Sequence, residues 1–564
     1  MDKIKNVAQR LGIITVEDMQ RYTALELIMM IANKMNEFRE IMYDYSDELQ
    51  NLDDKIQYLL NEGTLEEIVQ IFDRWLQDGT FEMLINQSAL KDVNDRIDVI
   101  NAHLPEISAN VKSCGYDNTG KNDTSDIFDS LLVDNSCIYF PQGKYLIRKN
   151  ILIENRSNIT LDGNLSKILL DQQCELTFSN CNNITLKNMD IESKKYHLNF
   201  VNFNNCTNLV IENCTFNGNG FLNWDIIKPD TTNGTKVGLL FRACEKVIIQ
   251  KCVIKGFWFR DSLDFAGCKN VKILCNNISY VGGAGIALKN SNTDFTIKDN
   301  TLENCCVYNW TNGQGGTDGV IDTYGPIEQG QTPNTHILIE NNHISKFGTS
   351  GATLSGIRVS GSQYIKVKKN TIENAYVDGS NSILIQPRSR GDMYTITHNI
   401  LISENTLQAT HSQYFMGSLQ FNGECRDVTV TKNRFNNRLT NANVWGPIIY
   451  VKTEVANLYI TDNIIGDYSN AIIGIAINIK NNHKGVFVKN NSIHALKTSI
   501  NIDDSSNIIV DNNNMKSTYS NVAYTNTTNL RITNNVLWGE KYIVPNEGVV
   551  LENNVLFNLE VDGN

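Results

Sequence analysis

The sequence predicts a mainly β protein: a right-handed, single-stranded parallel β-helix preceded by an α-helical, coiled-coil N-terminal module. The first observation behind this prediction is a repeat in which two apolar residues flank an outward residue, followed by polar residues and another apolar one. Clear copies are Leu209–Ile211, Val247–Ile249, Ile337–Ile339, Val428–Val430 and Leu530–Ile532. A repeat of roughly 20–30 residues with strand periodicity and no helical pattern between copies is typical of a solenoid, in which each copy is one coil.

Two further regularities support the same fold. Each coil contains a second short apolar strand, as in Leu176–Phe178, Val201–Phe203, Leu263–Phe265, Ile357–Val359 and Ile500–Ile502. A fixed turn position carries asparagine in Asn276, Asn300, Asn342, Asn370, Asn405, Asn433, Asn463, Asn491, Asn513, Asn535 and Asn554. Coils stack about 4.8 Å apart, so we expect these equivalent side chains to form ladders along the axis.

Residues 1–110 have a helical pattern instead. Apolar residues alternate at three- and four-residue steps in Leu90, Val93, Ile97, Ile100, Leu104 and Ile107. This spacing fits either an ordinary amphipathic helix or an a/d seam between helices. Because the segment directly precedes a β-helix, we favour a threefold stalk, which makes residues 1–110 a trimerising module and the protein a homotrimer.

Residues 111–155 join the two parts. A polar stretch, Gly115–Thr124, leads into an expected short helix, and Cys137–Ile147 reads as strand, turn and strand around Pro141. This stretch resembles the N-terminal cap of pectate-lyase-like β-helix proteins, which places the β-helix itself at residues 156–564. With the helical module, the chain resembles a tailspike or pre-neck appendage protein of short-tailed phages that infect Gram-positive bacteria.

The resemblance implies a virion component that is assembled in the host cytoplasm, attaches to tail or collar proteins through residues 1–110 and acts at the host cell surface. Related appendages often carry a C-terminal trimerising or self-cleaving domain, and none is visible before the chain ends at Asn564. Trimer assembly is then expected to rest on the stalk and the β-helix faces, unless such a segment has been removed.

Composition narrows the function classes. The chain has 564 residues, 41% of them hydrophobic, and 8 prolines, which indicates a folded soluble protein of more than one domain. The net charge of −12 and the lack of a basic run argue against nucleic acid and anionic membranes as partners. No stretch reaches the roughly 18 apolar residues of a membrane span.

The cysteines are expected to be buried thiols. Most of the 13 cysteines fall on inward ladder positions, including Cys214, Cys252 and Cys275 near the turn. Buried cysteine behaves as a small apolar residue, so we interpret the set as core rather than as disulfides. No metal-spaced pair occurs, and the adjacent Cys305 and Cys306 are poorly placed to chelate together.

Long coils indicate where a site could lie. Three steps between ladder positions are extended, and the extra residues form expected loops at 217–237, 304–334 and 375–396. Loops longer than a turn requires are usually functional on a rigid scaffold. These carry aromatic and charged residues that suit a carbohydrate groove: Trp224, Trp310, Asp318, Tyr324, Glu328, Arg388, Arg390 and Asp392. Plain solvated loops with scattered aromatic residues are the alternative.

Between those loops, outward strand positions become charged. Arg242, Asp261, Asp264 and Arg358 replace the neutral residues of other coils, and the expected strand 318–322 puts Asp318 and Asp322 on one face. Asp264 and Asp322 would lie two coils apart, about 9–10 Å at the backbone. Their side chains could then reach the roughly 6.5–9.5 Å of an inverting glycosidase pair. We expect these residues to face solvent, with Arg358 keeping Asp322 ionised; a surface salt bridge is the alternative.

The candidate site residues follow from these positions. The catalytic candidates are Asp264, Asp322, Asp261, Asp318 and Glu328, and the substrate-binding candidates are Arg242, Arg358, Arg388, Arg390, Trp224, Trp310 and Tyr324. The arginines favour an anionic polymer, and the resemblance favours hydrolysis of wall teichoic acid phosphodiesters. A capsular polysaccharide glycosidase and a non-enzymatic adhesin are the alternatives. No cofactor is assigned, although phosphodiester hydrolysis could use a divalent cation. A calcium-dependent lyase is disfavoured, because no Lys or Arg is evidently paired with a larger acidic cluster.

Overall fold

The structure is a computed structural model that describes residues 107–557 apart from 172–173, 195–199, 224–227, 230–236, 308–318, 327, 349–353, 374–380, 391–392, 408–417, 437–446, 467–473, 483, 496 and 540–548. All described residues belong to a unit of residues 103–564. Most of the predicted helical module, residues 1–106, lies outside the described residues, so its stalk and its trimer remain predictions.

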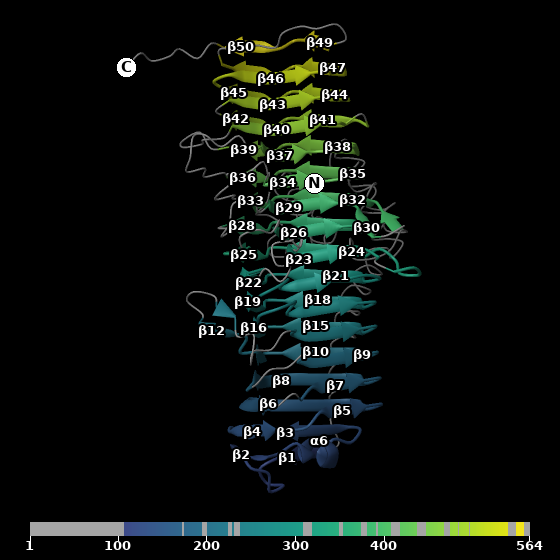
Figure 1. Cartoon of the computed structure of the whole chain (residues 1–564), viewed down its shortest axis with the longest axis vertical. Helices are drawn as coiled ribbons and strands as arrows, with labels where there is room; N and C mark the ends of the chain where they lie inside the picture. The colour runs from purple at the N-terminus through teal and green to yellow at the C-terminus, as the bar shows by residue number, and fades with distance from the viewer. Residues whose placement is uncertain are drawn as a thin grey trace, which may run out of the picture. The chain divides into compact units, whose positions relative to one another are not determined.

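The described residues form coils that stack in chain order, and each coil adds strands to two long parallel sheets (Figure 1). The 14-stranded sheet consists of β5 (Ile151–Glu154), β7 (Leu176–Ser179), β9 (Val201–Asn204), β14 (Leu239–Arg242), β17 (Leu263–Ala266), β20 (Ile286–Leu288), β23 (Gly319–Tyr324), β26 (Ser355–Ser360), β29 (Asn381–Gln386), β34 (Leu419–Phe421), β37 (Pro447–Val451), β40 (Ile475–Lys480), β43 (Thr498–Asp503) and β46 (Ser520–Thr525).

The 32-stranded sheet usually takes two strands from each coil. Its strands are β1 (Ile107–Asn110), β2 (Thr119–Asp123), β3 (Ser136–Tyr139), β4 (Lys144–Ile147), β6 (Ser157–Leu170), β8 (Asn182–Ser193), β10 (Thr207–Glu212), β11 (Thr215–Asn217), β15 (Glu245–Gln250), β16 (Val253–Phe257), β18 (Lys269–Leu274), β19 (Asn277–Val281), β21 (Thr293–Lys298), β22 (Thr301–Cys305), β24 (Thr335–Glu340), β25 (His343–Ser345), β27 (Gln363–Lys368), β28 (Thr371–Glu373), β32 (Thr397–Ser403), β33 (Thr406–Leu407), β35 (Cys425–Thr431), β36 (Arg434–Phe435), β38 (Val455–Thr461), β39 (Ile464–Ile465), β41 (Val486–Lys489), β42 (Ser492–Ala495), β44 (Ser506–Asp511), β45 (Asn514–Ser517), β47 (Thr528–Thr533), β48 (Val536–Trp538), β49 (Val549–Glu552) and β50 (Val555–Phe557).

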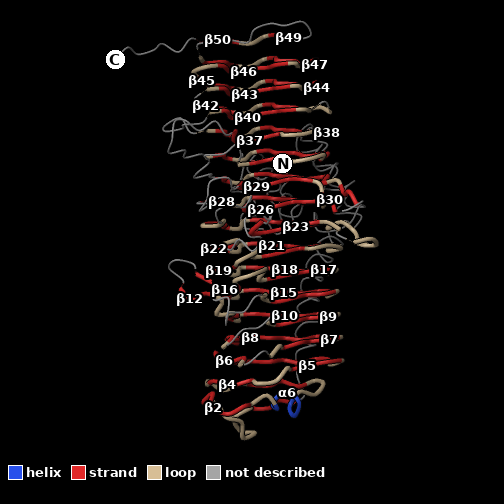
Figure 2. The backbone as a smooth tube through the Cα atoms, viewed as in Figure 1, coloured by secondary structure: helices blue, strands red, loops and turns tan. Residues whose placement is uncertain are grey.

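This architecture confirms the predicted parallel β-helix, and the strands dominate the backbone of the described part in Figure 2. Each predicted apolar strand pairs with its equivalent in the next coil; for example, Leu209 pairs with Val247 and Ile211 with Ile249. Inward residues fill one continuous core, in which Phe178, Phe203, Phe241 and Phe265 stack ring on ring at 4.5–5.1 Å. The alternation of apolar and polar residues therefore sets both the register and the core.

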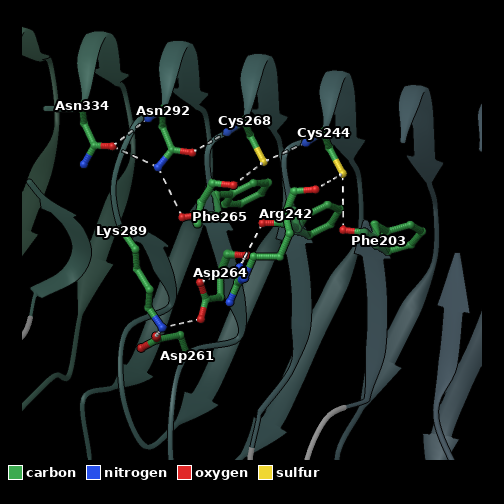
Figure 3. Close-up of polar contacts among 12 residues, drawn as sticks. Phe203, Arg242, Cys244, Asp261, Asp264, Phe265, Cys268, Lys289, Asn292 and Asn334 are labelled. Carbon is green, nitrogen blue, oxygen red and sulfur yellow. Dashed lines mark hydrogen bonds and ion pairs between the residues drawn. The ribbon is translucent and has the colours of Figure 1, made fainter. Parts of the chain in front are cut away.

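The asparagine ladder is also confirmed. Asn342 donates from its backbone N and its Nδ2 to Oδ1 of Asn370 at 2.9 and 3.0 Å, and Asn370 repeats both bonds to Asn405. A second ladder runs through Cys244, Cys268, Asn292 and Asn334 at the other turn (Figure 3). Both ladders satisfy buried backbone donors that a tight turn leaves without a partner in its own coil.

The cysteines follow the prediction with one clear exception. Cys214 and Cys252 are buried on the asparagine ladder, but Cys275 is exposed, so its predicted inward position is wrong. Cys275 has a φ of 54° at the turn residue before Asn276, and this left-handed turn directs its side chain away from the core. No disulfide joins cysteines in the described part of the chain.

The N-terminal cap has the predicted elements, with a different beginning. The helix α6 spans Asp126–Leu131, and β3 and β4 form the strand, turn and strand around Pro141. However, the helical module was predicted to extend to residue 110, whereas Ile107–Asn110 form β1 and pair with β3. Ile107 therefore belongs to a strand and not to the helical seam. It is the last apolar residue of the predicted helical spacing, and there pairing with β3 determines the backbone conformation.

The long insertions contain regular structure that the sequence did not suggest. The expected loop 375–396 holds β29, which is a full strand of the 14-stranded sheet, followed by an antiparallel hairpin of β30 (Arg388–Arg390) and β31 (Met393–Thr395). The expected loop 217–237 holds the antiparallel pair β12 (Phe221–Asn223) and β13 (Lys228–Pro229). Among the described residues, no helix is long and apolar enough to cross a membrane.

Candidate functional site

The charged residues lie in one register on the outer face of the 14-stranded sheet. Asp264 pairs with Ala287, Ala287 with Asp322, and Asp322 with Arg358. The predicted placement of Asp264 and Asp322 two coils apart, with Arg358 in the next coil, is therefore confirmed. Other coils place neutral residues in this row, namely Thr177, Asn202, Leu240, Leu384, Gln420, Tyr450, Asn478, Asn501 and Ala523.

Asp264 is held by two cations. Its Oδ1 accepts a hydrogen bond of 3.0 Å from Nη1 of Arg242, and its Oδ2 forms a short ion pair with Nζ of Lys289. The same ammonium lies 3.1 Å from Oδ2 of Asp261, whose Oδ1 accepts the backbone N–H of Ala284. Figure 3 shows the ammonium of Lys289 pointing at this pair of carboxylates. The two aspartates, one lysine and one arginine thus form one network, which we call the Asp264 cluster.

Lys289 is the charge that balances this cluster. Burial alone would lower its pKa, but the two nearby carboxylates of Asp261 and Asp264 outweigh burial and raise the pKa above the usual value for lysine. The ammonium therefore stays protonated throughout the neutral range, and a proton shared between the carboxylates is not needed to relieve their repulsion. The cluster can hold an anion or orient a water, but Lys289 is a poor acid.

A second ion pair lies two coils further along the row. Arg358 donates from Nε to Oδ1 of Asp322 at 2.7 Å and from Nη2 to Oδ2 at 2.5 Å, which is a bidentate pair. The Tyr324 ring packs beside it, with its centroid 5.7 Å from Cζ of Arg358 and 5.2 Å from Cζ of Arg388. Both distances are within the range of a cation–π contact. Burial raises the pKa of the Tyr324 phenol, which therefore remains neutral.

Solvent exposure corrects the sequence prediction. Asp264, Asp322 and Arg358 were expected to face solvent, but they are only 2%, 2% and 3% exposed. The alternative of a surface salt bridge is wrong for the same reason. Outward side chains here are long and pack against one another, as the Tyr324 ring does against the two guanidinium groups. The better-exposed polar group is Arg242, whose side chain is 38% exposed, while Lys289 and Asp261 are 17% and 14% exposed.

The remaining predicted residues lie apart or outside. Trp224, Trp310, Asp318 and Asp392 lie outside the described residues. Glu328 is exposed in a turn and hydrogen-bonds to Gln331, and it takes part in neither ion-pair group as far as the structure describes them. Arg388 and Arg390 lie on β30, and Arg388 reaches the Tyr324 ring.

Lys289 was missed by the sequence analysis. Its signal was available, because it directly follows the strand Ile286–Leu288, just as Arg242 ends β14 and Tyr324 ends β23. These strand ends form a second outward row beside the first. Comparing the residue after each apolar strand, and not only the one inside it, would have identified Lys289.

A metal site does not emerge from the described residues. No group of three or more His, Cys, Asp or Glu side chains there could hold an ion. The nearest approach is the pair Asp261 and Asp264, and the ammonium of Lys289 already occupies the space between their oxygens. A divalent cation there would be repelled by the Lys289 ammonium, so it would have to displace this side chain.

Comparisons with known proteins agree with the cap and the coils. A family model described as rhamnogalacturonase A/epimerase, pectate lyase-like, matches residues 108–313. A pre-neck appendage protein of Bacillus phage B103 is 25% identical over 158 residues, which are 27% of this chain and 17% of that protein. The chain therefore aligns with about a sixth of this relative, and the predicted resemblance to phage appendage proteins is confirmed over that stretch.

Two solved structures are similar at a lower level. PfbA, a surface adhesin of Streptococcus pneumoniae, aligns with a TM-score of 0.43 and 16% identity, over 75% of this chain and 91% of the adhesin. Tailspike protein 3 of bacteriophage CBA120 aligns with a TM-score of 0.33 and 12% identity, over 84% of this chain and 63% of the tailspike.

Proposed function

We propose that this chain is a tail appendage of a phage of Gram-positive bacteria and that it binds a polymer of the host cell surface. The observation that carries the proposal is the group of charged side chains on neighbouring coils, in which Asp264, Asp322 and Arg358 share one outward row and Arg242 and Lys289 lie beside it. The other coils place neutral residues in the row that holds Asp264, Asp322 and Arg358. The relative from Bacillus phage B103, a pre-neck appendage protein, supports a place in the virion tail.

Wall teichoic acid is the polymer that fits this chemistry best. Its backbone phosphates are anionic, and Arg242 offers a guanidinium that is 38% exposed beside the Asp264 cluster. Arg388 presents a second guanidinium against the Tyr324 ring. Arginine binds phosphate oxygens through paired N–H donors, so two such groups along the coil axis suit a polymer with repeated phosphates.

We rank binding above hydrolysis because each carboxylate is already paired with a cation. Asp264 pairs with Arg242 and Lys289, and Asp322 pairs with Arg358. A hydrolase needs a base that is free to take a proton and an acid that protonates the leaving group. In the Asp264 cluster both carboxylates are paired with a cation, and no side chain there is an evident acid.

Hydrolysis is the second candidate, and one observation favours it. Asp261 and Asp264 converge on one ammonium, so their oxygens lie within about 6 Å of each other, the sum of two hydrogen-bond lengths. Asp261 could take a proton from water as the water attacks phosphorus, and the leaving oxygen of the broken P–O ester bond would take its proton from solvent. Lys289 would then stabilise negative charge on the phosphate and not act as the proton donor.

A direct test compares binding and chain length. The protein is incubated with purified wall teichoic acid and, separately, with capsular polysaccharide, and polymer binding and polymer size are measured. We expect teichoic acid to be bound more tightly, and binding to weaken about tenfold or more in Arg242→Ala, because one phosphate contact is lost. Arg531→Ala is the matched control, since Arg531 is also an exposed arginine in an ion pair, but on β47.

The same incubation separates the two candidate functions. Shortened teichoic acid, with turnover reduced about 100-fold in Asp261→Asn, would establish hydrolysis. Intact polymer with retained binding would establish the adhesin. If Arg242→Ala bound each of the two polymers as tightly as wild type does, the proposed site would be contradicted.

A further inference from the structure

The two turn ladders change residue type within one coil. Followed in chain order, the ladder residues are cysteines up to residue 268 and asparagines over the coils that come next. The cysteines are Cys181, Cys206, Cys214, Cys244, Cys252 and Cys268, and the asparagines that follow them are Asn276, Asn292, Asn300, Asn334 and Asn342. Figure 3 shows this change in the second ladder, between Cys268 and Asn292. The change therefore falls in the coil that begins with β17 and holds both Cys268 and Asn276.

Cysteines and asparagines link their coils with different strength. Asn300 donates its backbone N and its Nδ2 to Oδ1 of Asn342, at 3.0 and 2.9 Å. Cys244 donates its backbone N to Sγ of Cys268 at 3.4 Å. A thiol sulfur is a weak acceptor and its S–H a weak donor, and cysteine carries no amide group. An asparagine step between coils is therefore stronger than a cysteine step.

The step from cysteine to asparagine is intermediate in both ladders. Cys252 donates its backbone N to Oδ1 of Asn276 at 2.9 Å, and Cys268 donates its backbone N to Oδ1 of Asn292 at 3.0 Å. Neither cysteine can supply the Nδ2 bond that accompanies the backbone bond between successive asparagines. The strong ladder linkage therefore begins only after the coil of β17.

The apolar core changes at the same coil. The row of stacked phenylalanine rings ends at Phe265, and Leu288 follows it in the next coil. Phe265 contacts Phe295 of the other sheet edge-on, with ring centroids 5.3 Å apart. Stacked aromatic rings attract each other beyond the effect of burial, so the row links the coils before the change to one another. This stacking does not continue into the coil of β20.

Ion pairs of Lys289 cross the change. Lys289 follows β20, whereas Asp261 and Asp264 belong to the preceding coil (Figure 3). The Lys289 ammonium lies 3.1 Å from Oδ2 of Asp261 and forms a short ion pair with Asp264. Partly buried pairs of this kind are screened less by salt than exposed pairs. They add to the strand pairing of β17 with β20 and of β18 with β21, at the place where the ladders add least.

We propose that the strands from β5 through β17, with their six ladder cysteines, open together as one unit while the strands from β20 onward stay folded. We call this unit the cysteine section, and the ion pairs of Lys289 resist its opening. Each coil of a solenoid contacts mainly its neighbours, so its stability is a sum of coil and neighbour contributions, and a weaker section can open by itself. The inference goes beyond the proposed function and does not depend on it.

The cysteines themselves report the opening. The intact full-length protein is pulsed with N-ethylmaleimide at several temperatures below its melting point, and mass spectrometry measures the labelling of each thiol. Each rate is divided by the rate of the same thiol in urea-unfolded protein, which cancels differences in local reactivity. Cys305 and Cys425 are the internal controls, because both are 0% exposed and lie on strands after the change. We expect the six ladder cysteines to label at similar rates, at least about tenfold faster than these two.

Two variants test the cause of the opening. Lys289→Met should speed labelling of the six cysteines about tenfold without changing that of Cys425, because it removes the ion pairs across the change. The double variant Cys252→Asn, Cys268→Asn supplies the two missing amide donors and should slow labelling of the remaining four about tenfold. The matched control is Cys275→Asn, which changes an exposed residue of the same turn and should leave all rates unchanged.

The labelling pattern of wild type decides the proposal even if a variant folds poorly. Equal normalised rates for the six ladder cysteines and the two controls would overturn the cysteine section, and so would no labelling of the six below the melting point. Rates that fall steadily from Cys181 to Cys268 would show fraying coil by coil and would overturn opening as one unit. Wild-type rates in Lys289→Met would overturn the role of its ion pairs.

Discussion

Asp322 and Arg358 contact each other through two hydrogen bonds in a place that is almost closed to water. Bringing two charges out of water costs free energy that their attraction only partly returns, so such a pair is weak support for stability by itself. Removing one partner is different, because the remaining charge stays buried. The pair therefore acts chiefly by fixing Tyr324 and the coils around it.

Arg358→Met should lower the free energy of unfolding by about 3–5 kcal/mol, because it leaves Asp322 buried without its bidentate partner. The double variant Asp322→Leu, Arg358→Met should recover most of this loss, since Leu384 shows that the row accepts leucine. Urea unfolding of both variants measures the difference. A single variant as stable as wild type would contradict the buried pair.

Lys289 predicts a stability effect at alkaline pH. Its pKa is raised in the folded protein by Asp261 and Asp264 against the effect of burial, so the folded state holds this proton more tightly than the unfolded state. The contribution is complete below the unfolded pKa of about 10.4 and is lost as the pH rises through the folded value. The stability difference between wild type and Lys289→Met should be constant from about pH 7 to 9 and shrink above about pH 10.5. A difference that grows with pH would contradict this sign.

The asparagine ladder links the coils through side chains that occupy the same position in each turn. Asn405 accepts both the backbone N and the Nδ2 of Asn370, and it donates to Asn433 and to the Val367 carbonyl. Asn276 is the first asparagine, and its Oδ1 accepts only the backbone N of Cys252. In the second ladder, the Sγ of Cys268 accepts a hydrogen bond from the backbone N of Cys244, so a cysteine can occupy such a position.

This difference predicts unequal costs for one substitution at two equivalent places. Asn405→Cys should destabilise the protein by about 1–3 kcal/mol more than Asn276→Cys. A cysteine sulfur can accept one backbone N–H, as Cys268 does, which replaces the bond to Cys252 but leaves the Nδ2 of Asn370 without its acceptor. Thermal unfolding of the two variants measures the gap. Equal melting temperatures would show that the ladder bonds contribute little individually.

The strands were predictable from sequence because their alternation is strict and repeated. Leu263–Phe265 and Ile357–Val359 gave the register that places Asp264 and Asp322 two coils apart. The burial of these aspartates was not predictable, since it depends on side chains from other coils, such as Tyr324, that the local pattern does not connect to them. Strand β29 was missed because a long insertion precedes it and a hairpin follows, so the coil length suggested a loop.

Residues 107–564 contain what a separate folding unit requires. The first coil is closed by α6, whose Ile127 and Phe128 are buried in the same core as Ile138 and Phe140. The apolar end of the coil stack is thereby covered from within this part of the chain. We therefore predict that residues 1–106 serve assembly and are not required for folding of the β-helix.

Deleting residues 1–106 should therefore leave the β-helix folded, because β1 begins at Ile107 and its pairing with β3 is retained. Circular dichroism should show the same β signal and a cooperative melt.

The full-length protein should sediment as a trimer of the 63.5 kDa chain, since the seam before the β-helix is expected to join three copies. The truncated protein shows which part holds the trimer: a folded monomer assigns it to the helical seam, and a folded trimer assigns it to the β-helix faces. Sedimentation of the full-length chain at 63.5 kDa at micromolar concentration would contradict the trimer, and loss of the β signal on truncation would contradict the boundary.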